Sequence, residues 1–146
     1  MIELLIIALS LAGLVISIYF TFAYYGRVKK ARWIPGILCV REGSSCATVV
    51  QTPYARVFGA PNSLLGIGYY LLVIAVAVHG LEIPFHGVYY VIAPFHIVFP
   101  ASLATVLLGF YLIYALRRKL RIDCLLCYTA HVINLVLLAL LLAAAY

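Results

Sequence analysis

Residues 122–127 read IDCLLC and open an apolar run that continues to residue 146. Cys124 and Cys127 are three positions apart, so on a helix they share one face and can form a disulfide or hold one ligand. The unsatisfied N–H groups and the positive end of the dipole at a helix start stabilise a thiolate, which is the reactive form of cysteine. Asp123 is the expected N-cap residue. The stretch therefore predicts a reactive cysteine pair at the start of the last helix.

The composition around this pair is that of an integral membrane protein. Of the 146 residues, 67% are hydrophobic and only 10% are charged, with a mean hydropathy of +1.17. Soluble domains average about 45–50% apolar and about 25% charged residues. In lipid every backbone polar group must be satisfied within its own segment, which favours helices over open sheets. We therefore expect an all-α integral membrane fold.

Four apolar runs each approach or exceed the ~20 residues that cross a bilayer as a helix. They cover residues 2–25, 63–80, 88–116 and 124–146. The first run begins Met-Ile-Glu and lacks the positive start and cleavage site of a secretory signal, so we expect it to be retained. Pro94 and Pro100 are expected to kink or break the start of the third run, or to mark a segment at the interface that precedes the span proper. The prediction is one domain, residues 1–146, built as a four-transmembrane-helix bundle with both termini on one side.

The segment at residues 26–62 is the only long polar stretch, and it carries Cys39 and Cys46. The six-residue spacer between these cysteines contains Gly and Ser and can close into a disulfide loop. A short helix is predicted at residues 46–51, where it would cover the mouth of the bundle as a lid. Four spans place this loop and Cys124 on the same side of the membrane, so all four cysteines are predicted to gather at one mouth.

The basic residues lie on that same side, and none lies on the other. They are Arg27, Lys29, Lys30, Arg32, Arg41, Arg56, Arg117, Arg118, Lys119 and Arg121. Short loops rich in Lys and Arg stay in the cytoplasm, which predicts a cell-membrane, multi-pass protein with its cysteine side inside the cell. Intracellular disulfides are unusual outside hyperthermophiles. The alternative is an extracytoplasmic cysteine side, with the basic residues serving head groups or a partner.

Several motifs follow one another in an order typical of one family: a Cys-x6-Cys pair, a Thr, an Asn-Ser-x-x-Gly helix entry and a final Cys-x-x-Cys. These are Cys39 and Cys46, Thr52, Asn62 with Ser63 and Gly66, and Cys124 with Cys127. The order resembles the vitamin K epoxide reductase family. The sister family of bacterial quinone-linked disulfide oxidases carries its Cys-x-x-Cys before the widely spaced pair.

The resemblance implies a bundle that surrounds a quinone of ubiquinone or menaquinone type and receives electrons from a thioredoxin-fold partner. By position, the resemblance makes Cys127 the thiolate next to the quinone, with Cys124 as its disulfide partner. Cys46 would exchange with Cys124, and Cys39 with Cys46 and the partner. The expected enzyme is a quinone-dependent thiol–disulfide oxidoreductase that promotes protein disulfide formation. Membrane lipid is the other expected partner. No nucleic acid is expected to bind, and no oligomeric state is predicted.

Two polar residues are expected to contact the quinone. Asn62 matches the family's quinone-contacting Asn, although it could instead cap the second helix. His131 lies one turn after Cys127 on a stripe that also includes Asn134, and polar groups in a membrane helix usually face the bundle interior. Judged from the residues alone, a helix–helix hydrogen bond is an equal alternative for His131. Animal members of the family commonly have Tyr at this position. The supporting residues are Thr52, Tyr54, Ser63 and Asn134.

Two other interpretations use the same cysteines. Four thiolates could hold a structural zinc ion, although such sites commonly use two closely spaced pairs, which the x6 spacing does not provide. The cysteines could also only staple a membrane bundle that has no catalytic activity. We expect a redox relay and no metal.

Overall fold

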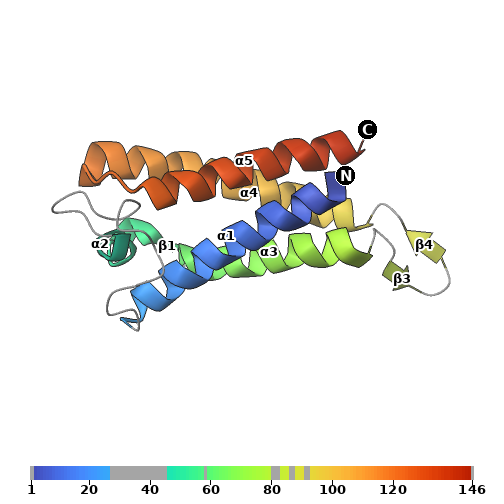
Figure 1. Cartoon of the computed structure of the whole chain (residues 1–146), viewed down its shortest axis with the longest axis horizontal. Coiled ribbons are helices and arrows are strands. Elements are labelled where there is room, and N and C mark those ends of the chain that lie inside the picture. The colour runs from blue at the N-terminus through green and yellow to red at the C-terminus, as the bar shows by residue number, and fades with distance from the viewer. Residues whose placement is uncertain are drawn as a thin grey trace.

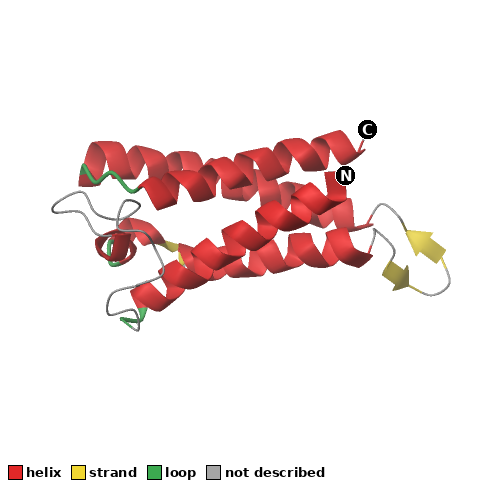
Figure 2. Cartoon of the chain, in the orientation of Figure 1, coloured by secondary structure: helices red, strands yellow, loops and turns green. Residues whose placement is uncertain are grey.

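The structure is a computed structural model that describes residues 2–26, 46–57, 59–79, 83–85, 88–90 and 93–145. Long helices dominate it, and they lie side by side (Figure 1): α1 (Ile2–Tyr24), α3 (Asn62–His79), α4 (Ala93–Tyr114) and α5 (Leu125–Ala145). α1 packs against α3 and α5, and α4 packs against the same two helices. The long helices therefore close into a bundle. Figure 2 shows how little of the described chain is strand or loop.

In the described part of the chain, three helices are long and apolar enough to cross a membrane. They cover Ile2–Tyr24, Ile97–Leu120 and Leu125–Ala144, and α3 contributes a shorter apolar helix, Asn62–Val78. Large apolar side chains such as Leu4, Val15 and Leu107 are exposed on the outside of the bundle. Lipid tails solvate such side chains as well as another helix would. The chain is therefore a helical membrane protein.

One end of the bundle carries several short elements that lead back into α3. They are α2 (Cys46–Val50), η2 (Pro53–Ala55), β1 (Arg56–Val57) and β2 (Ala60–Pro61). β1 and β2 pair antiparallel, with Val57 opposite Ala60. Gly59 adopts a positive φ of 84° in the intervening turn, which glycine does without steric cost. This turn delivers the chain directly to Asn62, the first residue of α3.

The opposite end carries a hairpin that the apolar pattern did not predict. β3 (Ile83–Phe85) pairs antiparallel with β4 (Val88–Tyr90), and α4 begins only at Ala93 rather than at the expected residue 88. Valine and tyrosine favour strands, which explains the pairing of these residues. Pro94 falls in the first turn of α4, where its missing N–H is tolerated, and the helix continues through Pro100.

The connection between α4 and α5 is shorter than the gap from residue 117 to residue 123 that separates the two predicted apolar runs. α4 continues as the wider η3 (Ala115–Leu120), so most of the basic residues there are helical. Arg121 then takes a left-handed φ of 53°, and its N–H donates to the Leu116 carbonyl. The Ile122 N–H donates to the same carbonyl at 3.2 Å. This tight turn brings Cys124 back to the end of the bundle.

Two hydrophobic clusters make up the core. The cluster at the cysteine end, here the mouth cluster, joins α1, α2, η3 and the start of α5: Phe20, Ala23, Val49, Val50, Leu116, Cys124, Leu126 and Cys127. The second cluster fills the remainder of the bundle: Ile6, Tyr69, Tyr70, Val73, Val98, Ile133 and Leu137. A β-carbon on Gly13 of α1 would clash with Cζ, Cε1 and the hydroxyl of Tyr70. The absence of a side chain at Gly13 therefore lets α1 approach α3 closely. The cysteines are thus part of the packed core.

Candidate functional site

Cys124 itself is the N-cap residue of α5. The first helical hydrogen bond runs from the Tyr128 N–H to the Cys124 carbonyl at 3.1 Å, and the Cys127 N–H donates to Cys124 Sγ at 3.3 Å. A side chain that accepts from the third helical N–H is the usual capping arrangement. The expectation that Asp123 caps this helix was therefore wrong by one residue. Asp123 Oδ1 instead accepts a hydrogen bond from the Tyr128 hydroxyl at 3.2 Å.

The two sulfurs are buried and interact with each other. Cys124 is 2% exposed and Cys127 is 8% exposed. The pKa of Cys124 is lowered because the Cys127 side chain donates a hydrogen bond to its sulfur, and this outweighs the opposing effect of burial. The backbone N–H groups of Cys127 and Leu126 lower it further. In the reduced pair this favours the thiolate form of Cys124, at the helix start, whereas the resemblance implies a thiolate on Cys127.

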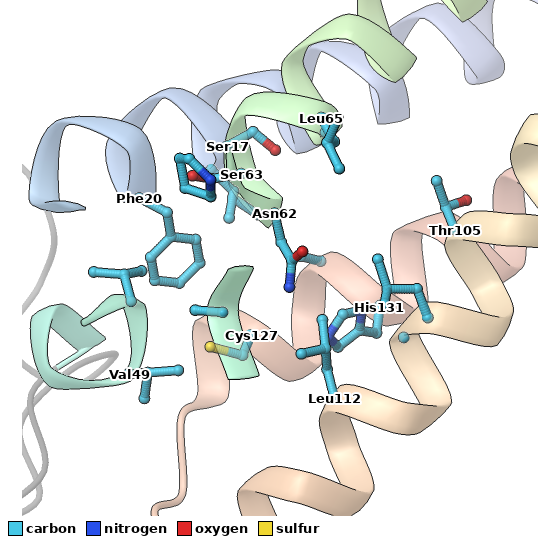
Figure 3. Close-up of a pocket in the computed structure, with 18 of the residues that line it drawn as sticks. Ser17, Phe20, Val49, Asn62, Ser63, Leu65, Thr105, Leu112, Cys127 and His131 are labelled. Carbon is cyan, nitrogen blue, oxygen red and sulfur yellow. The ribbon is translucent and has the colours of Figure 1, made fainter. Parts of the chain in front are cut away.

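A cavity of about 150 Å³ lies inside this end of the bundle (Figure 3). Its walls come from α1, α2, η2, α3, α4, η3 and α5, and they are almost entirely apolar. Of the two cysteines at the start of α5, Cys127 lines the cavity and Cys124 does not. Both cysteines therefore belong to the mouth cluster, but only Cys127 also borders the interior space.

Asn62 and His131 line the same cavity from different helices. Figure 3 shows both side chains around the space that Cys127 also borders. Asn62 Nδ2 donates to the Tyr54 carbonyl at 3.3 Å. Among the described residues, the buried Asn62 Oδ1 and His131 Nδ1 have no hydrogen-bond partner. Buried polar atoms are normally paired, so these two side chains retain unused capacity to bind a ligand.

The four residues predicted to support the site, Thr52, Tyr54, Ser63 and Asn134, also line the cavity. Three of them hydrogen-bond to other parts of the protein. Thr52 Oγ1 donates to the Val49 carbonyl at 2.7 Å, and Ser63 Oγ lies 2.9 Å from Thr21 Oγ1. The Tyr70 hydroxyl donates to Asn134 Oδ1 at 2.6 Å. Tyr54 contributes its carbonyl to Asn62, so these residues fix the walls of the cavity.

α2 packs directly against the cysteine pair. Val49 and Val50 belong to the mouth cluster together with both sulfurs, and Gln51 Nε2 donates to the Tyr24 carbonyl at 2.9 Å. α2 begins at Cys46, one helical turn before Val49 and Val50. The structure thus brings the beginning of this helix close to Cys124. Cys39 and the side chain of Cys46 lie outside the described residues.

The structure adds several cavity residues that the sequence interpretation missed: Tyr69, Tyr70, Thr105 and Gly109. Tyr69 lies 3.0 Å from Ser102, hydroxyl to hydroxyl, inside the bundle. The available signal was the presence of polar or very small residues within otherwise apolar runs. The side chains of the other three histidines, at positions 79, 86 and 96, lie outside the described residues. No group of three metal-binding side chains gathers within the described set.

The basic residues that the structure describes lie at the cysteine end of the bundle. Two of their guanidinium groups stack on tyrosines: Arg117 lies 5.6 Å from the ring centre of Tyr128, and Arg56 lies 5.4 Å from that of Tyr24. Such contacts anchor long cationic side chains over aromatic faces. The basic residues at positions 27, 29, 30, 32 and 41 lie outside the described residues.

Comparison with known proteins identifies the family. Residues 4–142 match the model of the vitamin K epoxide reductase family, a range that includes the cysteine pair, the cavity residues and nearly all of the bundle. A search of curated proteins found no match. The motif order and the match over nearly the whole chain point to the same group. The chain belongs to the vitamin K epoxide reductase family, whose members are membrane oxidoreductases that act on thiols and disulfides.

Proposed function

We propose that this chain transfers electron pairs from the dithiol of a thioredoxin-fold partner to a membrane quinone, and so promotes disulfide formation in proteins. The observation that carries the proposal is the cavity that Cys127, Asn62 and His131 line together. Members of the family generally use quinones. In this proposal α3 is the fourth membrane span, so that the bundle surrounds the quinone on all sides.

The cavity suits a quinone in shape and chemistry. A quinone head group is flat and apolar and carries carbonyl oxygens that become hydroxyls on reduction. The apolar walls accommodate the ring. The imidazole of His131 can donate to a quinone carbonyl, and the unpaired Asn62 Oδ1 can accept from a hydroxyl of the quinol. Ligand sites are commonly apolar cavities with a few convergent polar groups. A quinone of ubiquinone or menaquinone type would enter from the bilayer.

The proposed transfer proceeds by two exchanges and one oxidation. The Cys46 thiolate attacks Cys124 of the Cys124–Cys127 disulfide, and Cys127 leaves as a thiolate that faces the cavity. Cys39 then attacks Cys46, which forms the Cys39–Cys46 disulfide and releases Cys124. The reduced pair gives two electrons and two protons to the quinone, which becomes a quinol while the Cys124–Cys127 disulfide forms again. The partner's dithiol reduces the Cys39–Cys46 disulfide and is itself oxidised.

The geometry of Cys124 favours the second exchange. A thiol with a lowered pKa leaves faster in thiol–disulfide exchange. Cys124 has such a pKa because of the hydrogen bonds from Cys127 and from the start of α5. Cys124 lies in the mouth cluster beside α2, and α2 begins at Cys46. In the proposed relay, Cys46 would attack Cys124 from this side. Cys127, which lines the cavity, is then placed for the quinone.

The proposal is tested with the protein purified in detergent and fully reduced. A short-chain quinone is added, and the loss of thiols and the formation of quinol are followed together. Oxidation is expected in the wild type and should be abolished in Cys127→Ser. Thr129→Ala is the matched control, because Thr129 lies on the exposed face of α5 outside the cavity. Full quinone reactivity in Cys127→Ser would overturn the proposal.

The loop cysteines are tested separately. Cys46→Ser and Cys39→Ser should retain oxidation of the Cys124–Cys127 pair by quinone but should no longer oxidise a thioredoxin-like protein. A structural zinc site would instead mask four thiols until a chelator is added. A disulfide that only staples the bundle would resist mild reductant and would not respond to quinone.

A further inference from the structure

The side chain of His131 packs against α4 at Gly109, which has no side chain of its own. A β-carbon on Gly109 would lie 2.8 Å from His131 Nδ1, 3.3 Å from Cγ and 3.5 Å from Cε1. Real β-carbons essentially never approach heavy atoms more closely than 3.0 Å, so any other residue at position 109 would force the imidazole or the helix beside it to shift. Gly109 is buried and also lines the cavity. The two residues therefore share one wall of the proposed quinone site.

This contact fixes which ring nitrogen faces α4. Nδ1 is the His131 atom nearest to the absent β-carbon, it is buried, and it has no partner among the described residues. A buried N–H without an acceptor is rarer in proteins than a buried acceptor without a donor. A neutral imidazole in this position therefore keeps Nδ1 unprotonated and carries its hydrogen on Nε2. Nε2–H is then the group that a ligand in the cavity would meet.

We propose that Gly109 is a positioning residue: by leaving room for the His131 ring against α4, it presents Nε2–H to a carbonyl oxygen of the quinone. The inference deepens the proposed function and rests on it. The other glycines near the cavity act differently. A β-carbon on Gly66 would lie 2.7 Å from Ser17 Oγ, which is a contact between α3 and α1. Gly109 is set apart because the side chain it accommodates is a proposed quinone ligand.

The matched control is Gly68 on α3. A β-carbon there would meet no atom within 4 Å, and Gly68 does not line the cavity. Gly68→Ala therefore reports the effect of replacing a helical glycine alone, which should slightly favour the helix. The comparison between Gly109→Ala and Gly68→Ala isolates the contact with His131.

The first readout is the imidazole itself. The protein is labelled with ¹⁵N-histidine, and the signals of His131 among the four histidines are assigned from His131→Ala. We expect an Nε2–H tautomer in the wild type and in Gly68→Ala, and altered His131 ring signals in Gly109→Ala. Unaltered ring signals in Gly109→Ala, or an Nδ1–H tautomer in the wild type, would overturn the inference.

The second readout is quinone kinetics. Gly109→Ala should raise KM for a short-chain quinone roughly tenfold, the loss expected for about one hydrogen bond, with kcat changed less than about twofold. In the His131→Ala background, adding Gly109→Ala should change nothing, because residues that act through one another are not additive. An equal effect of Gly109→Ala in both backgrounds would show that Gly109 does not act through His131.

Two further outcomes are decisive. If Gly109→Ala does not accumulate, the double variant with His131→Ala should do so, because the clash has been removed. Failure of both would show that Gly109 serves packing alone. If the wild type does not reduce quinone at all, the proposed function fails, whereas the ¹⁵N signals still decide whether Gly109 sets the position of His131.

Discussion

The backbone N–H of Cys127 donates to Sγ of Cys124 at 3.3 Å, so the first cysteine of the pair caps the helix on which the second one lies. Because of this contact, the two cysteines have different surroundings although their side chains are chemically identical. Cys124 accepts the hydrogen bonds that favour a thiolate, and it lies in the mouth cluster. Cys127 lines the cavity. In the proposed relay, thiol–disulfide exchange with Cys46 therefore occurs at Cys124, and Cys127 is the cysteine that contacts the quinone.

The hydrogen bond from the Cys127 side chain should control the acidity of Cys124. In Cys127→Ala the thiol donor is lost while the backbone N–H donors remain, so the pKa of Cys124 should rise towards its ordinary value. Cys127→Ser retains a donor and should raise the pKa less. The measurement is the rate of Cys124 alkylation against pH, in a background where Cys39 and Cys46 are Ser. A lowered pKa keeps the thiolate present at lower pH, so the Cys127→Ala profile should shift to higher pH. Identical profiles for the two variants would contradict this.

The partly buried hydrogen bond from Tyr70 to Asn134, 2.6 Å long, should stabilise the packing of α3 against α5. Tyr70→Phe leaves Asn134 Oδ1 without its donor, and Asn134→Leu removes the acceptor. A double-mutant cycle on the free energy of unfolding in detergent should give a coupling of about 0.6 kcal/mol, the average for hydrogen bonds between membrane helices, and at most about 1.7 kcal/mol. Strict additivity of the two substitutions would mean that the hydrogen bond contributes no stability.

Close packing of α1 on α3 should depend on Gly13. Since a β-carbon at this position would clash with the edge of the Tyr70 side chain, Gly13→Ala should destabilise the bundle by about 1–3 kcal/mol, as overpacking of a core does. Gly68→Ala serves again as the control with open space around it. Thermal unfolding in detergent measures both variants. A Gly13→Ala protein as stable as Gly68→Ala would show that α1 can move away from α3 at no cost.

The excess of basic residues on the cysteine side predicts that this side faces the cytoplasm. In a background without native cysteines, Lys119→Cys and Glu3→Cys place single exposed thiols at opposite ends of the bundle. A membrane-impermeant thiol reagent added to intact cells should label Glu3→Cys and leave Lys119→Cys unlabelled. The reverse pattern would place disulfide formation outside the cell.

Local sequence determined much of this protein. The composition is rich in apolar residues, which indicated a segment in lipid, and there helices satisfy the hydrogen-bonding groups of the backbone. It correctly indicated a helical membrane protein. The spacing of Cys127, His131 and Asn134 follows the period of one helix, and all three residues line the cavity. The order of the cysteine motifs identified the family, because it is a property of the chain alone.

Tertiary structure decided what local spacing cannot encode. The capping residue was misplaced by one position, because Asp123 and Cys124 can both cap a helix and only the observed hydrogen bonds distinguish them. The contact of Gly109 with His131 joins two different helices, so it depends on how α4 packs against α5. A glycine in an apolar run shows no such role by itself. The sequence supplied the reactive groups, and the packing of the helices determined which of them face one another across the cavity.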